Sequence, residues 1–200
     1  MKIPLPGLRS LREWASRIQM RKGVLTDVFN MLDVAGKRMS HRDRVVVLAF
    51  DEMSVNKTIE IDKRNDDVIG PHSEMQVVSA RGLFSKWKQP LYVNFDQQLT
   101  KTILDDLIIR LHSIGFTVVA NVHDCGGGNM GLWREIGIDY SQGKTSMKHP
   151  ETNQDIYFFP DAPHLLKLIR NWLIDHGFFY KGSYFFIFNL YGIKKLIKIE

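Results

Sequence analysis

The sequence predicts an α/β fold in which a mixed sheet is flanked by helices, with a short helical attachment at the N-terminus. Two apolar runs rich in β-branched residues, Val45–Phe50 and Phe116–Val122, are too short for globular helices and are typical of buried strands. Between them, apolar residues recur at helical spacing from Leu99 to Ile114, and Gly115 follows as a C-terminal cap. Strands that alternate with amphipathic helices indicate a sheet covered by helices.

Length and composition restrict the class of protein. The chain has 200 residues and a mass of 23.2 kDa, which corresponds to one ordinary domain or to one domain with a short second piece. Its 44% of apolar and 24% of charged residues are typical of a globular chain. The single cysteine, Cys125, excludes an internal disulfide and a four-thiolate zinc site. No signal-peptide pattern opens the sequence, so we expect an intracellular protein.

Composition divides the chain into three segments. Two apolar patterns at helical spacing predict a helical segment over residues 1–43, and residues 44–177 carry the sheet and its helices. The tail at residues 178–200 differs in composition and shows no recognisable mechanism. Residues 184–193 within it are too short and too polar to span a bilayer, which needs about 20 apolar residues, so no membrane partner is expected.

The predicted elements of residues 44–177 follow one another in a recognisable order. They are a strand at 45–50, further strands at 58–61, 76–80 and 91–95, a helix at 99–114, a strand at 116–122, a short helix at 129–136, a loop at 139–153, a strand at 156–159 and a helix at 165–173. An antiparallel meander followed by two crossover units is the order of the ribonuclease-H-like fold. In that fold the strands at 45–50 and 116–122 would lie side by side.

Three of the predicted strands end in a carboxylate: Asp51, Asp124 and Asp161. Ligand sites of open α/β sheets lie at the carboxyl ends of parallel strands, and neighbouring strands are about 4.8 Å apart. Acids that meet there can share divalent cations such as Mg²⁺ or Mn²⁺, which activate a water or hydroxyl for attack on a phosphodiester. Alternatively, each acid caps a turn or a helix. For Asp161 the N-cap interpretation is favoured; for Asp51 and Asp124 both interpretations stay open.

Charge is distributed unevenly along the chain. Residues 1–44 carry ten Lys or Arg and four Asp or Glu, whereas residues 45–177 carry thirteen basic and seventeen acidic residues. A basic flank beside an acidic centre is typical of a nucleic-acid enzyme with a carboxylate metal site. Ordinary solvated surface charge explains the pattern equally well.

Three ordered strings resemble the catalytic domain of P-element-type transposases, whose members often carry a THAP zinc finger. The first is VVLAFDEMSV at 46–55, followed by Gly70 and RGLFSKWKQPLYVNF at 81–95. The second is VVANVHDCGGGN at 118–129, and the third is FFPDAPHLLKLIRNWL at 158–173. The resemblance covers residues 1–177 in the family's order.

The resemblance implies a ribonuclease-H-like, cut-and-paste DNA transposase that uses Mg²⁺ or Mn²⁺. Asp51 and Asp124 match the first two members of the family's acidic triad, and Asp161 is a possible substitute ligand. The family's third acid is a glutamate beyond a large GTP-binding insertion; we expect neither in this chain, which therefore resembles a truncated member. The implied partners are DNA at transposon ends and further copies of the chain, and the implied location is the nucleus. The alternative is an inactive remnant, or a domesticated DNA- or protein-binding module that keeps only the fold.

The remaining polar and aromatic candidates are interpreted as structural. Gly126–Gly128 lacks the phosphate-loop pattern and is expected to form a flexible turn beside Asp124. Trp133 is expected to pack in the core, and His123 has no ligand-spaced partner. Cys125 lacks an assigned base and is expected to be a small buried filler.

Overall fold

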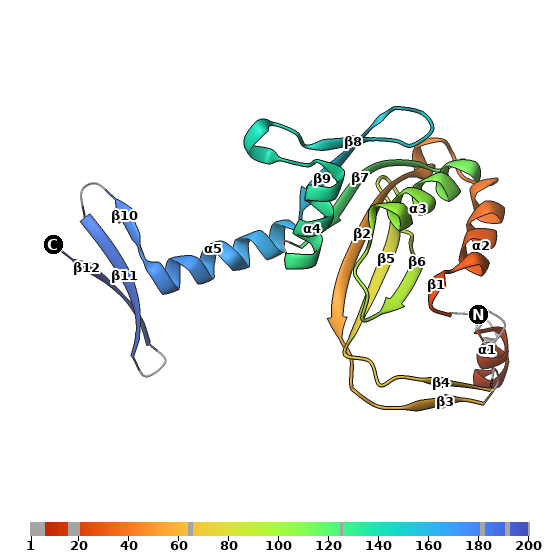
Figure 1. Ribbon diagram of the computed structural model, residues 1–200, viewed down its shortest axis with the longest axis horizontal. Helices are drawn as coiled ribbons and strands as arrows, with labels where there is room; N and C mark the ends of the chain where they lie inside the picture. Colours follow the sequence, from red (N-terminus) through yellow and green to blue (C-terminus); the bar gives the residue numbers. More distant parts are fainter. Residues whose placement is uncertain are drawn as a thin grey trace, which may run out of the picture. The chain divides into compact units, whose positions relative to one another are not determined.

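The computed structural model describes residues 7–15, 21–63, 66–124, 126–180, 183–190 and 193–199. The chain forms two compact units, residues 1–159 and residues 160–200 (Figure 1). Cys125 and the predicted helical position Ile18 lie outside the described residues. Among the described residues, no helix combines the length and the apolar character needed to cross a membrane.

A mixed sheet of seven strands forms the centre of the first unit, in the order β1-β6-β5-β2-β7-β9-β8. Its strands are β1 (Gly23–Val24), β2 (Val45–Ser54), β5 (Glu74–Gly82), β6 (Lys88–Phe95), β7 (Thr117–His123), β8 (Ser146–Lys148) and β9 (Asp155–Pro160). Strand β2 pairs antiparallel with β5 on one side and parallel with β7 on the other. The expected side-by-side placement of the strands at 45–50 and 116–122 is therefore confirmed.

Helices surround this sheet. The first unit contains α1 (Leu8–Ala15), α2 (Thr26–Gly36), α3 (Lys101–Ser113) and α4 (Gly127–Ile136), with short 3₁₀ turns at Arg42–Arg44 and Tyr140–Gln142. Figure 1 shows α3 lying across the sheet, and α3 packs on β7 and against α4. The predicted fold class, a ribonuclease-H-like mixed sheet flanked by helices, describes this arrangement.

Burial alternates along β2 because one face of the strand meets the helices. Val46, Leu48 and Phe50 are buried, whereas the residues between them are half-buried. The facing side of α3 supplies Leu104, Leu107, Ile108 and Leu111, all fully buried. Burying an aliphatic side chain stabilises the fold by about 1.5–3 kcal/mol, so this cluster anchors the sheet that carries Asp51.

The ends of α3 follow from its sequence. The Thr100 hydroxyl accepts a hydrogen bond from the Ile103 backbone N–H at 3.4 Å, which caps the N-terminus. Gly115 takes the left-handed conformation, with φ +84°, and the backbone N–H of Phe116 donates to the Leu111 carbonyl at 2.9 Å. The predicted glycine cap is confirmed, and it turns the chain directly into β7.

The prediction that residues 58–61 form a strand of the central sheet is wrong. Instead of residues 58–61 pairing there, β3 (Glu60–Asp62) pairs with β4 (Asp67–Ile69) in a separate two-stranded sheet. In Figure 1 this hairpin extends away from the central sheet. Ile59 and Ile61 are 64% and 68% exposed, because apolar residues are too few here to bury a strand face. The meander is completed by β5 and β6 instead.

The second unit is a helix followed by a small sheet. It contains α5 (Ala162–His176) and three antiparallel strands, β10 (Phe178–Tyr180), β11 (Ser183–Leu190) and β12 (Ile193–Ile199). The tail, for which the sequence indicated no particular structure, thus forms the strands β10–β12. The predicted loop at 139–153 likewise contains a strand, β8, which pairs with β9.

Candidate functional site

The parallel pair β2–β7 brings two of the predicted acids to one edge of the sheet. Its register runs from Val45 opposite Thr117 to Phe50 opposite His123, with a bulge where Val47 meets Ala120. The rings of Phe50 and His123 stack at a centroid distance of 4.4 Å. The next residues along the chain are Asp51, within β2, and Asp124, directly after β7, so the two acids follow neighbouring residues of the parallel pair.

Asp124 is held by the turn that follows it. Its Oδ1 atom accepts a hydrogen bond from the Gly126 backbone N–H at 3.0 Å and from the Asn129 side-chain amide at 2.6 Å. Asn129 lies in the first turn of α4 and is only 4% exposed. Gly126 and the first turn of α4 therefore bend back onto Asp124 and fix its carboxylate. The expected flexible turn at Gly126–Gly128 is wrong in part, because Gly127 and Gly128 are already the first residues of α4.

Asp51 is more open. Its side chain is exposed, and its Oδ1 atom accepts a hydrogen bond from the Glu52 backbone N–H at 2.9 Å. Because β2 continues to Ser54, Asp51 sits inside the strand rather than after it. Its carboxylate is accordingly positioned by the strand backbone.

Glu52 adds a third carboxylate to this edge. Burial raises the pKa of Glu52 above its ordinary value of 4.5, and the negative charges of Glu74, Asp124 and Asp51 raise it further. The acids are thus close enough to repel one another. A bound cation would relieve this repulsion.

Glu52 also approaches the start of α4. A Cβ atom placed on Gly128 would lie 3.2 Å from the Glu52 Oε1 atom and 2.7 Å from the Gln98 Nε2 atom. The absence of a side chain at Gly128 therefore lets Glu52 and Gln98 meet the helix N-terminus. A carboxylate is stabilised there by the helix dipole.

The donor set suits a hard divalent cation. Mg²⁺ prefers oxygen ligands, keeps several waters and is commonly held by one or two carboxylates together with substrate phosphates. Asp51 and Asp124 provide such carboxylates. The pKa of Glu52 beside them is raised by burial first and then by the charges of Glu74, Asp124 and Asp51. Within the described part of the chain, no group of three His, Cys, Asp or Glu residues could hold a metal. The two aspartates therefore supply the ligand type that Mg²⁺ prefers, and their service as metal ligands stays a prediction.

His123 and Trp133 form a buried hydrogen-bonded pair next to Asp124. His123 is 2% exposed, and burial lowers its pKa, an effect that its hydrogen bond to Asp124 opposes. The Trp133 indole N–H donates to His123 Nε2, and the Trp133 ring is 5% exposed. The predicted core position of Trp133 is confirmed.

Sequence reasoning missed Asn129 and the role of His123. A polar residue five positions after an acid and directly after three glycines is the signal that could have found Asn129. No signal marked His123, since its partner Trp133 is ten residues away on another element.

Asp161 belongs to the second unit. Its Oδ2 atom accepts a hydrogen bond from the His164 backbone N–H at 3.2 Å, so it is the N-cap of α5, with Pro163 in the first turn. The N-cap interpretation of Asp161 is confirmed. Its service as a metal ligand stays a prediction.

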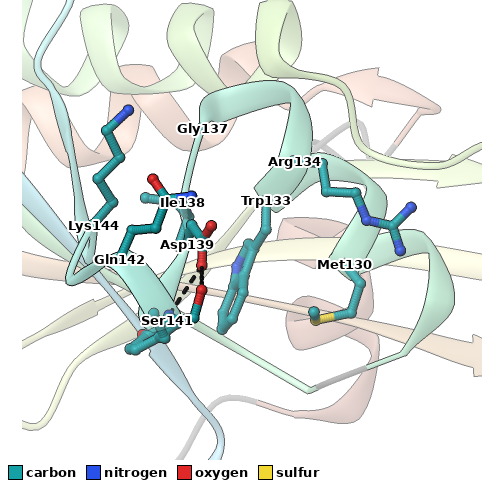
Figure 2. A pocket seen from close by; sticks show the side chains of 10 residues that line it. Met130, Trp133, Arg134, Gly137, Ile138, Asp139, Ser141, Gln142 and Lys144 are labelled. Atoms are coloured by element: carbon teal, nitrogen blue, oxygen red, sulfur yellow. Dashed lines mark hydrogen bonds between the residues drawn. The ribbon is translucent and has the colours of Figure 1, made fainter.

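A separate pocket lies between α4 and the turn at Tyr140–Gln142. It encloses about 550 Å³, and its lining includes Met130, Trp133, Arg134 and Lys144. Figure 2 shows Arg134 and Lys144 extending on opposite sides of Trp133. None of the acids at the sheet edge lines this pocket.

A mixed sheet with a central parallel pair, acids at its edge and helices around it defines a ribonuclease-H-like domain. Residues 20–137 match the family model described as the TNP-like, RNase H N-terminal domain. The match covers more than half of the chain, and the chain belongs to this family.

Two curated proteins and one solved structure extend the comparison. The chain is 38% identical to the transposable element P transposase of Drosophila melanogaster over 90% of its length, and 27% identical to the DNA transposase THAP9 of Homo sapiens over 84%. It spans 24% and 21% of the lengths of these relatives. A structure of the Drosophila P element transposase strand transfer complex superposes with a TM-score of 0.76 at 36% identity, covering 95% of this chain and 40% of that one. The chain is a P element transposase homologue, and its fold class is confirmed.

Proposed function

We propose that this domain takes part in Mg²⁺-dependent cleavage and transfer of DNA strands, with Asp51 and Asp124 as metal ligands. The observation that carries the proposal is the register of β2 and β7, in which Phe50 opposite His123 leaves the two aspartates as the next residues. The similarity to a transposase solved as a strand transfer complex supports the same chemistry.

Each acid would contribute in a different way. Asp124, fixed by Gly126 and Asn129, provides a carboxylate of constant orientation. Asp51, exposed on the strand, provides one that incoming phosphate can approach. When bound, divalent cations would polarise a phosphoryl oxygen and activate the attacking water or hydroxyl. The role of the two carboxylates would be to bind these cations next to the phosphodiester.

DNA is the proposed partner, and transposon ends and a nuclear location follow from that proposal. Residues 1–44 carry an excess of basic residues, which favours contact with phosphates. Asp51 and Glu52, in contrast, would repel the DNA backbone unless a cation neutralises them. Binding of DNA at this edge is therefore expected to depend on divalent cations.

A second candidate is a DNA- or protein-binding module without cleavage activity. It is favoured by one observation: the described residues contain no group of three His, Cys, Asp or Glu that could hold a metal. In that case the fold is kept and the basic flank alone binds DNA.

A metal titration combined with a nicking assay separates the two functions. The full chain is titrated with Mn²⁺ and incubated with supercoiled plasmid, alongside Asp51→Asn and Asp124→Asn. Asp106→Asn is the matched control, because Asp106 is an exposed acid of α3 paired with Arg110. Mn²⁺ binding and nicking that both variants lose, and the control keeps, support the metal-dependent function. DNA binding with no response to Mn²⁺ or to either variant supports the binding module.

A further inference from the structure

His123 makes two hydrogen bonds that fix its ring completely. Its Nε2 atom accepts from the Trp133 indole N–H, which can only donate. The lone pair on Nε2 must therefore be available, and the ring proton must sit on Nδ1. Nδ1 in turn donates to the backbone carbonyl of Asp124, with a nitrogen–oxygen distance of 2.6 Å. The partners thus specify one tautomer of the imidazole.

Aromatic rings hold this imidazole from three sides. Phe50 stacks on it at 4.4 Å with an interplanar angle of 23°, and Trp133 meets it edge-on at 4.9 Å and 70°. Phe158 of β9 approaches at 6.4 Å, again edge-on. Phe50, Phe158 and Trp133 are all nearly fully buried, so the ring of His123 has little freedom to rotate.

We propose that His123 is a positioning residue for Asp124, and that Trp133 fixes its orientation. The proposal rests on the function proposed above, in which Asp124 is a metal ligand. His123 anchors the main chain of Asp124 from β7, while Gly126 and Asn129 anchor its carboxylate from the turn and from α4. Asp124 is thus held both at its main-chain carbonyl and at its carboxylate.

The physical reason for such an anchor lies in the chain path. Asp124 follows the last residue of β7, so it lies beyond the ladder that fixes the carbonyls of the strand itself. Without His123 the main chain at Asp124 could rotate about its N–Cα bond, which would move the carbonyl and the side chain together. Partners behind a metal ligand typically contribute 10- to 100-fold to metal affinity, which is the size of effect expected here.

Two substitutions of His123 and one of Trp133 test this proposal. In His123→Asn the amide NH₂ lies near the place of Nδ1 and can still donate to the Asp124 carbonyl, whereas His123→Phe keeps only the ring. Trp133→Phe leaves His123 in place and removes the indole donor. His149→Asn is the matched control, since His149 is likewise buried in this unit, at 5% exposed, and its Nδ1 accepts from the backbone N–H groups of Glu151 and Thr152.

Two readouts are measured on the full chain. The first is Mn²⁺ affinity, from the free Mn²⁺ signal in electron paramagnetic resonance. The second is hydrogen exchange of the Gly126 amide, which is bonded to the Asp124 carboxylate and needs no metal. Thermal unfolding of each variant checks that it is folded.

We expect His123→Phe to weaken Mn²⁺ binding by about 10-fold or more and to speed hydrogen exchange of the Gly126 amide. Trp133→Phe should change both quantities in the same direction by a smaller factor. His123→Asn should keep much of the Mn²⁺ affinity and of the exchange protection. Folded His123→Phe and Trp133→Phe variants with unchanged exchange and affinity would overturn the positioning role. So would a His123→Asn variant no better than His123→Phe, or an equal loss in His149→Asn. If the unmodified chain binds no Mn²⁺ while the ranking of Gly126 exchange holds, the proposed function fails and the anchoring of Asp124 by His123 stands.

Discussion

Glu52 lies close enough to Asp124 for the Asp124 charge to raise the pKa of Glu52, although Glu52 belongs to β2 and Asp124 follows β7. Asp51 and Glu74 act on Glu52 in the same direction. Together with the larger effect of burial, these negative charges disfavour ionisation of Glu52.

The first prediction is that Asp51→Asn stabilises the metal-free chain. It removes one of the negative charges beside Glu52 and keeps the shape of the side chain. Because these groups are largely exposed, the expected gain is small, about 1–3 °C in melting temperature. Adding Mn²⁺ should raise the melting temperature of the unmodified chain more than that of the variant. A lower melting temperature for metal-free Asp51→Asn would contradict the idea of repulsion at this edge.

The raised pKa of Glu52, caused by burial and by the neighbouring negative charges, predicts that the stability of the fold depends on pH. The pKa of Glu52 is higher in the folded chain than its ordinary value of 4.5, so the folded state binds this proton more tightly than the unfolded state. The contribution of Glu52 to stability is fully present below pH 4.5 and is lost as pH rises through the folded pKa. Following the Glu52 carboxyl by NMR in the unmodified chain and in Asp51→Asn tests this, and the pKa should be lower in the variant.

Asp96 is expected to hold the turn that leads into β5. Its Oδ1 atom accepts from the backbone N–H groups of Ser73 and Glu74, and its Oδ2 atom contacts His72 Nδ1 at 2.8 Å. The Ser73 hydrogen bond is the main cause that lowers the pKa of Asp96 below 3.8, followed by His72. This stability is present above pH 3.8 and is lost as pH falls through the folded pKa.

The test compares Asp96→Asn with Asp96→Ala. Asp96 has φ +51°, a conformation that Asn adopts more readily than Ala, and Asn keeps an acceptor oxygen. At neutral pH we expect both variants to melt at lower temperature and Ala to be the worse. In thermal melts near pH 3 the difference between the unmodified chain and both variants should shrink. A constant difference across this range would show that the Asp96 charge is not involved.

Gly36 is expected to resist enlargement because it lies against a buried ring. A Cβ atom at this position would be 3.0 Å from Cε2 and 3.2 Å from Cζ of Phe116, which is fully buried. Gly36→Ala should therefore destabilise the chain by about 1–3 kcal/mol in urea unfolding, even though Ala favours helices. Combining it with Phe116→Leu should cost less than the two single changes added together. Strict additivity would show that the ring is not the obstacle.

Two other glycines should respond with opposite signs. Gly131 lies inside α4, and a Cβ atom there would have no neighbour within 4 Å, so Gly131→Ala should stabilise the chain by about 0.5–1 kcal/mol. Gly115 has φ +84°, and a Cβ atom there would lie 2.9 Å from an Arg44 guanidinium nitrogen. Gly115→Ala should destabilise by about 1–2 kcal/mol. Urea unfolding of both variants checks the pair, and equal signs would contradict it.

The parts of the fold that could be predicted are those with strong local signals. The buried runs of β2 and β7 and the acids after Phe50 and His123 were enough to expect Asp51 and Asp124 at one edge of the sheet. The caps at Gly115 and Asp161 were equally visible, since left-handed glycine and N-terminal Asp have local causes.

The parts that could not be predicted depend on partners far along the chain. The hairpin of β3 and β4 has exposed apolar residues that imitate a buried strand in sequence. Asn129, His123 and Glu52 are set by hydrogen bonds and charges that exist only once β2, β7 and α4 are assembled. Periodicity reports burial, and it does not report which polar group a buried side chain meets.

The bulge between β2 and β7 decides which residues end up as neighbours. Val46 faces Val118 and Val47 faces Ala120, so Val119 is a supernumerary residue in the ladder. If the same two strands paired without the bulge, Asp51 would stand beside His123, and the acids would be one residue out of step. A slip of one residue sends side chains to opposite faces of a sheet. The alignment of the carboxylates at the far end of the strands is thus set by a single surplus valine near their beginning.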